Sequence, residues 1–124
     1  MSFGIRLVVT IAFMALLLVA SIIPGRAQHG DSVLIRMVAA TPTLLQKIMH
    51  VALYALLALL WIWTLEAIES VHARLLAALV IAVGYGGALE WSQTRSPGRF
   101  GTVTDVFLNA AGAIMGVLAA VLLL

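Results

Sequence analysis

Four long runs of apolar residues, separated by segments that are more polar, dominate the pattern of the chain. They cover residues 7–23, 48–65, 75–89 and 106–124. A helix rises about 1.5 Å per residue, so crossing a hydrocarbon core of roughly 30 Å takes about 20 residues. The pattern therefore predicts one all-α domain over residues 1–124, a polytopic membrane protein with four transmembrane helices in an up-down bundle. The expected spans are roughly 5–23, 46–65, 73–93 and 104–124.

The third run is the shortest of the four. Its fifteen residues reach only about 22 Å as a helix. To span, it must recruit the polar residues 72–74 at one end or 90–93 at the other. Length alone therefore pushes polar side chains toward the membrane.

The segment that follows the first run has two further interpretations. Arg6 before the run and Gly25-Arg26-Ala27 after it also fit a cleaved signal peptide, which is the alternative to a retained first span. Residues 26–41 hold too few apolar residues to span. We expect them to form a short helix on the membrane surface.

Composition supports the membrane assignment and excludes several classes of protein. The chain is 64% hydrophobic and 10% charged, against about 45–50% and about 25% in soluble domains. It has no cysteine, which excludes disulfides, thiolate catalysis and cysteine-ligated metals. The net charge of +2 is not gathered into a basic stripe, so nucleic acid is not an expected partner. Two Lys and Arg fall on one side of the membrane and five on the other. Without Lys47 and Arg99, which neighbouring carboxylates can hold, the counts are two and three and do not set the orientation.

Polar side chains gather where the second span begins, the third ends and the fourth begins. Residues three, four or seven apart share a helix face, and this spacing relates Lys47, His50 and Tyr54, then Glu90 and Gln93, then Asp105, Asn109 and Gly112. In an up-down bundle these three stripes meet at one membrane face, beneath the connection that carries Arg95 and Arg99. At the opposite face the pattern predicts only a wet loop, with Glu66, Glu69, His72 and Arg74.

These motifs resemble the VanZ-like family of small bacterial membrane proteins. The matching residues are Lys47-x-x-His50-x-x-x-Tyr54, Glu90-x-x-Gln93 and Arg99-x5-Asp105-x3-Asn109-x-x-Gly112, which extend the resemblance over about residues 46–116. The resemblance implies four transmembrane helices in the bacterial cytoplasmic (inner) membrane and a place in the cell envelope. It also implies a link to resistance to the glycopeptide teicoplanin, in a family with no established reaction.

Three functions compete for the polar cluster. The favoured one is not enzymatic: Lys47 and Arg99 hold an anionic lipid or cell-wall precursor headgroup, Arg99 as a bidentate fork, while Gln93 and Asn109 orient it. The second is an enzyme acting on a lipid-linked phosphate, with His50 as base or nucleophile and Glu90 or Asp105 fixing its tautomer. The third is a small transporter in which Glu90 titrates.

Two structural interpretations stand beside these functions. The cations can pair with Glu90 and Asp105, so that the cluster only joins the helices. A metal held by His50, Glu90 and Asp105 has no supporting motif, and we predict no metal and no cofactor. The small residues Gly112 and Gly116 form a G-x-x-x-G, and Gly84 and Gly87 are similar. We expect all four to permit close helix packing within the chain, with homo-oligomerisation as the alternative.

Overall fold

The computed structural model describes residues 2–21, 43–93 and 103–123. Their regular elements are four helices, α1 (Phe3–Ser21), α3 (Thr43–Thr64), α4 (Val71–Gln93) and α5 (Val103–Leu123). Within α3, α4 and α5 lie stretches that are long and apolar enough to cross a membrane, and the apolar part of α1, Phe3–Val19, is shorter. The predicted all-α, four-helix membrane fold is confirmed.

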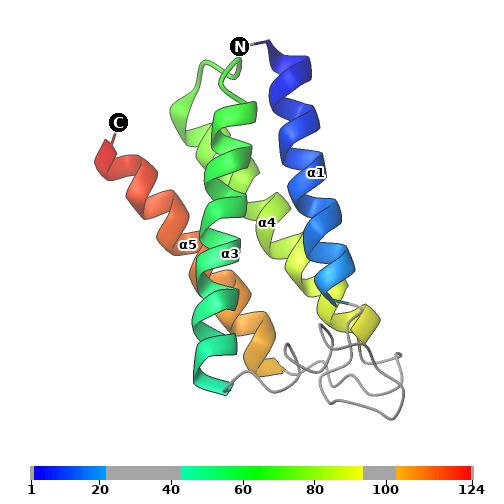
Figure 1. Cartoon of the computed structure of the whole chain (residues 1–124). Helices are drawn as coiled ribbons and strands as arrows, with labels where there is room; N and C mark the ends of the chain where they lie inside the picture. The colour runs from blue at the N-terminus through cyan, green and yellow to red at the C-terminus, as the bar shows by residue number, and fades with distance from the viewer. Residues whose placement is uncertain (1, 22–42, 94–102, 124) are drawn as a thin grey trace.

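The helices alternate in direction, as Figure 1 shows. α1 and α4 run one way, and α3 and α5 run the other. One end of the bundle therefore holds the starts of α1 and α4 with the ends of α3 and α5, and we call it the Arg6 end. The other holds the starts of α3 and α5 with the ends of α1 and α4, and we call it the His50 end.

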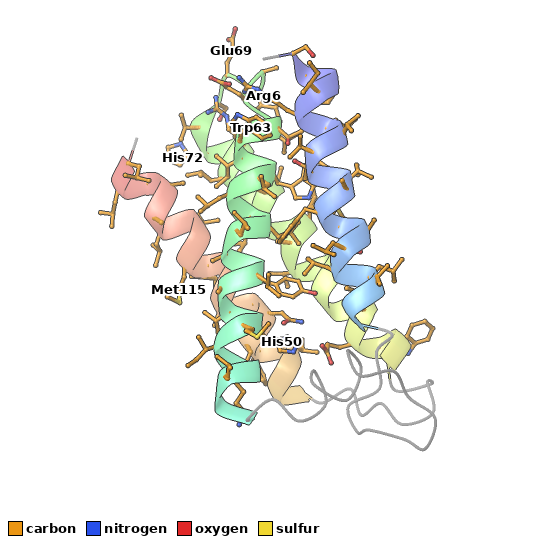
Figure 2. All side chains as sticks on the ribbon, in the orientation of Figure 1. Arg6, His50, Trp63, Glu69, His72 and Met115 are labelled. Atoms are coloured by element: carbon orange, nitrogen blue, oxygen red, sulfur yellow. The ribbon has the colours of Figure 1, made fainter. Side chains whose placement is uncertain are left out.

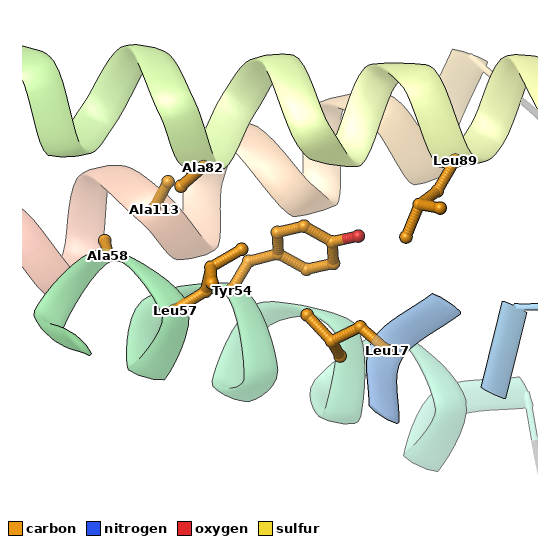
Figure 3. Close-up of a cluster of buried hydrophobic side chains, with 7 residues drawn as sticks. All are labelled: Leu17, Tyr54, Leu57, Ala58, Ala82, Leu89 and Ala113. Atoms are coloured by element: carbon orange, nitrogen blue, oxygen red, sulfur yellow. The ribbon is translucent and has the colours of Figure 1, made fainter. Parts of the chain in front are cut away.

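Three of the helices form a tight core, and α1 packs against it from one side. α3, α4 and α5 all contact one another, whereas α1 contacts α3 and α4 but not α5. The largest cluster of buried side chains draws on all four helices (Figure 3), and its members are Leu17, Tyr54, Leu57, Ala58, Ala82, Leu89 and Ala113. Small side chains at the centre let the helix axes approach closely.

The closest approach joins α3 to α5. A Cβ placed on Gly112 would overlap the backbone carbonyl oxygen of Val51, and one placed on Gly116 would overlap that of Ala55. The G-x-x-x-G of α5 thus lies directly on the backbone of α3. Such contact is available only to glycine, and it gains dispersion energy along two turns of both helices.

On α4 the close approach is made by a glycine other than the two expected. A Cβ on Gly84 or Gly87 would meet nothing within 4 Å, whereas one on Gly86 would lie 2.8 Å from Tyr54 Cε1. The reason is the phase of the helix. Ala78, Ala82 and Gly86 recur every four residues and are all buried, so Gly86 faces α3 and α5. Gly84 and Gly87 lie on other faces of α4.

The structure bears on most of the remaining expectations about the layout of the chain. The helix bounds lie within three residues of the expected spans, and α4 includes polar residues at both ends, from His72 to Glu90. The surface helix expected over residues 26–41 lies outside the described residues. α1 supplies Leu17 to the shared core, so in this structure the first span is an integral part of the bundle.

Candidate polar site at the His50 end

A hydrogen bond between α3 and α5 forms the centre of the site. His50 Nδ1 lies 2.8 Å from Asn109 Oδ1, and Figure 2 shows His50 on the lower part of α3. Asn109 is 1% exposed, while His50 is only half-buried. His50 lies about two helical turns inside the start of α3, so this pair belongs to the bundle's interior. His50 is the member of the pair that remains open to its surroundings.

Gly86 brings α4 into the same site. A Cβ on Gly86 would lie 3.0 Å from both Cβ and Nδ2 of Asn109, in addition to its contact with Tyr54. Tyr54 stands one turn after His50 on α3 and is 4% exposed. The bare backbone at Gly86 therefore lets Asn109 and Tyr54 pack side by side against α4.

Glu90 extends this face of α4 by one more turn. It follows Gly86 by four residues, so the two share a helix face, and its side chain is 3% exposed. A carboxylate within a membrane bundle costs several kcal/mol unless its surroundings stabilise it, and such groups generally mark functional sites. His50, Glu90 and Asn109 thus place three polar groups from three helices at one end of the bundle.

The structure places the other predicted site residues less closely. Lys47 is exposed, one turn nearer the start of α3 than His50. Gln93 and Asp105 lie in α4 and α5 at this same end, but their side chains are not among those described. Arg99 lies outside the described residues.

The chemistry of the described part of the site is that of hydrogen bonding. Within residues 2–21, 43–93 and 103–123, no group of three His, Asp or Glu side chains is placed to hold a metal ion. The sequence predicts that Glu90 or Asp105 orients His50. In the structure, the hydrogen-bond partner of His50 Nδ1 is instead the uncharged Asn109.

At the Arg6 end Glu66, Glu69 and His72 are exposed, in line with the predicted wet loop, but two arginines form contacts there that the sequence did not predict. Arg6 of α1 forms an ion pair with Glu66, and its Nη1 also donates to the Trp63 carbonyl at 2.9 Å. Its guanidinium lies 5.2 Å from the centroid of the Trp63 ring, within range of a cation–π interaction. Arg74 donates from Nε to the Ile68 carbonyl at 3.1 Å. Both arginines therefore brace the end of α3 and the connection to α4.

One turn further into the bundle, a buried threonine pair joins α1 to α3. Thr64 Oγ1 donates to the Leu60 carbonyl at 2.8 Å, and Thr10 Oγ1 lies 2.6 Å from Thr64 Oγ1. The two hydroxyls share one hydrogen bond, and Thr10 Oγ1 also lies 3.4 Å from the Leu60 carbonyl oxygen. Near the other end of α1, the Tyr85 hydroxyl donates to the Met14 carbonyl. These polar bonds add to the apolar packing of Leu17 in holding the first helix.

We expect Thr10→Val to loosen α1 without unfolding the core. The substitution removes one buried interhelical hydrogen bond, and such bonds stabilise membrane proteins by about 0.6 kcal/mol on average, up to about 1.7. Unfolding by dodecyl sulfate in mixed micelles, followed by circular dichroism, measures the loss. A double-mutant cycle with Thr64→Val is the control, and additive losses would show that the two hydroxyls do not interact.

Comparisons with known proteins bear on the whole chain. The VanZ/LLP1 family model matches residues 6–124, a range that covers all of α3, α4 and α5 and nearly all of α1. No curated protein matches the chain, and no solved structure matches it. The match confirms the resemblance first seen over residues 46–116 and extends it to the first helix. This multi-pass membrane protein belongs to the VanZ-like family.

Proposed function

We propose that this protein is a binding protein of the bacterial cytoplasmic membrane that holds an anionic lipid or cell-wall precursor headgroup at the His50 end. The observation that supports it is the convergence of His50, Glu90 and Asn109 from α3, α4 and α5, with the last two nearly fully buried. Helices that needed only to pack could do so through apolar side chains and small residues, as α3 and α5 do at Gly112 and Gly116. Buried polar groups beyond that need point to a ligand.

The positive and negative side chains of the site contact different parts of the ligand. Lys47 is exposed at the rim, and together with Arg99 it supplies positive charge for the phosphate of a headgroup. Glu90 repels a phosphate, so the anionic part of the ligand stays at the rim. The inner groups then contact the uncharged part of the headgroup, which turns from the rim toward His50.

The proposal extends to the cell envelope. The VanZ-like family is linked to teicoplanin resistance, and a protein that holds a precursor headgroup would change what a glycopeptide can reach. Expression in a susceptible strain is expected to raise the inhibitory concentration of teicoplanin, and His50→Gln is expected to abolish that increase. If the wild-type protein does not raise the inhibitory concentration, the link to teicoplanin is wrong for this protein and only the proposed lipid binding stands.

Lipid binding is tested with histidine variants from the two ends of the bundle. Native mass spectrometry of the purified protein, titrated with phosphatidylglycerol or phosphatidylcholine, counts the lipids that remain bound. We expect a preference for phosphatidylglycerol that falls about tenfold in His50→Gln, the loss given by about 1.4 kcal/mol. His72→Gln is the matched control, because His72 is exposed at the Arg6 end. If His50→Gln and His72→Gln retain phosphatidylglycerol equally well, His50 is not part of the binding site and the proposal is wrong.

A second candidate, an enzyme acting on a lipid-linked phosphate, draws on the His50–Asn109 hydrogen bond. A histidine whose ring is oriented by a second side chain is a common arrangement for a general base. Release of inorganic phosphate from phosphatidic acid, measured in the same micelles, separates the two candidates. Turnover that disappears in His50→Gln favours the enzyme, and binding without turnover favours the binding protein.

A further inference from the structure

Asn109 lies between His50 and α4, with the two ends of its amide group in different surroundings. Its Oδ1 lies 2.8 Å from His50 Nδ1, and its Nδ2 faces Gly86, where a Cβ would lie only 3.0 Å away. Within the described part of the chain, Nδ2 has no hydrogen-bond partner although it is buried. The amide thus presents its oxygen, a hydrogen-bond acceptor, to the imidazole ring.

A fixed acceptor decides which nitrogen of the ring carries the hydrogen. Oδ1 can only accept, so Nδ1 of His50 must be the donor. In the neutral ring Nε2 is then left bare, as a hydrogen-bond acceptor. This is the reverse of the tautomer that a free histidine side chain favours, which carries its hydrogen on Nε2. Asn109 therefore acts as a positioning residue that sets the chemistry of His50.

The half-buried His50 and the carboxylate of Glu90 would then both accept hydrogen bonds. Glu90 lies one turn from Gly86 on the same face of α4, and Gly86 in turn contacts Asn109. Two acceptors at the same end of the bundle match a group that donates, and a phosphodiester has no hydrogen to donate to them. A polyol offers two hydroxyls in one small group.

We propose that Asn109 holds His50 as the Nδ1–H tautomer, so that Nε2 and Glu90 select a headgroup bearing hydroxyls. The selected ligand is an anionic lipid with a polyol headgroup. Its phosphodiester stays at the rim near Lys47, and its hydroxyls donate to His50 and Glu90. This inference rests on the proposed function and names the ligand class of the same site.

The tautomer is tested first, because it requires no ligand. The ¹⁵N shifts of a histidine ring distinguish a protonated from a bare nitrogen, and the chain has only three histidines, which single His→Gln variants assign. We expect His50 to show a protonated Nδ1 and a bare Nε2 at neutral pH. Asn109→Leu should return it to the Nε2–H form. A wild-type His50 with its hydrogen on Nε2 overturns the inference.

The ligand class is tested with two lipids that differ only in hydroxyls. Phosphatidylglycerol and phosphatidylpropanol are both singly charged phosphodiesters with a three-carbon headgroup, but only the former carries a diol. We expect the wild-type protein to retain phosphatidylglycerol about tenfold better in native mass spectrometry, the effect of one to two net hydrogen bonds. Asn109→Leu should bind the two lipids equally, and circular dichroism shows whether this variant is folded.

A rescue keeps the test independent of folding. In Asn109→Ala, replacing His50 with Nδ-methylhistidine blocks Nδ1 and leaves Nε2 bare without help from residue 109. The preference for phosphatidylglycerol should return. Equal binding of both lipids by the wild type, with both lost in His50→Gln, overturns the polyol assignment and leaves the proposed function standing. If neither lipid is retained better than phosphatidylcholine, the proposed function itself fails.

Discussion

Gly112→Ala is expected to separate α3 from α5 and to give the largest loss of stability of any single methyl group added to this protein. The new Cβ would overlap the carbonyl oxygen of Val51 and lie 3.0 Å from its Cα. Backbone cannot rotate away as a side chain can, so the helices must move apart along their whole contact. Overpacking a close-packed interior typically costs 1–3 kcal/mol, occasionally more, and we expect about 3 kcal/mol here.

Unfolding by dodecyl sulfate in mixed micelles, followed by the circular dichroism of the helices, measures this loss. Gly116→Ala should behave alike, because its Cβ would overlap the carbonyl oxygen of Ala55. Gly84→Ala and Gly87→Ala are matched controls on α4, where a Cβ meets nothing within 4 Å. Alanine favours a helix over glycine by up to about 1 kcal/mol, so the controls should be neutral or slightly more stable. Equal losses at Gly112 and Gly84 would contradict the packing described.

The arrangement of the helices could be predicted from the sequence, because a chain inside a membrane has few ways to satisfy its backbone hydrogen bonds. Runs of apolar residues must form helices that satisfy their own backbone hydrogen bonds, and successive spans cross the membrane in opposite directions. From that alone, the starts of α3 and α5 and the end of α4 must share one end. His50 and Asn109 could be expected there from spacing. Their direct hydrogen bond depends on helix rotation, which spacing leaves open.

Gly86 shows why packing within α4 was harder to predict. Almost every residue between positions 75 and 89 is apolar or glycine, so hydropathy gives the helix no inward face. The informative signal was the four-residue spacing of small residues, Ala78, Ala82 and Gly86, which leads directly to Glu90. Because these small residues and Glu90 share one face of the helix, their spacing identifies the inward face of α4, which hydropathy does not.

The Arg6 end was underestimated for a different reason. Arg6 and Glu66 are 60 residues apart, and each taken alone has the usual appearance of a charge beside a membrane. Their pairing depends on how α1 packs against α3, which the sequence pattern of neither helix specifies. The i, i+4 spacing of Arg6 and Thr10 on α1 was the available signal, since it places both on the face that meets Thr64 and Trp63.

Gly86→Ala is expected to separate the function of the His50 end from the stability of the fold. Its Cβ would press on Tyr54 Cε1 at 2.8 Å and on Asn109 Cβ and Nδ2 at 3.0 Å. Tyr54 Cε1 and Asn109 Nδ2 can shift by a few tenths of an ångström through side-chain rotation, and Asn109 Cβ follows a small movement of α5. We therefore expect a loss of only about 1–2 kcal/mol, below that of Gly112→Ala.

The shift of Asn109 in Gly86→Ala has a consequence that stability does not report. A displaced Oδ1 no longer lies 2.8 Å from His50 Nδ1, and a hydrogen bond weakens steeply when its geometry is disturbed. The variant should therefore lose its selective retention of phosphatidylglycerol, and its His50 should return to the Nε2–H tautomer, at a helicity equal to that of the wild type. Gly84→Ala, two residues away on a face with open space, should keep both properties. A Gly86→Ala protein that is folded and retains the lipid as the wild type does would show that the contact between α4 and Asn109 is packing alone.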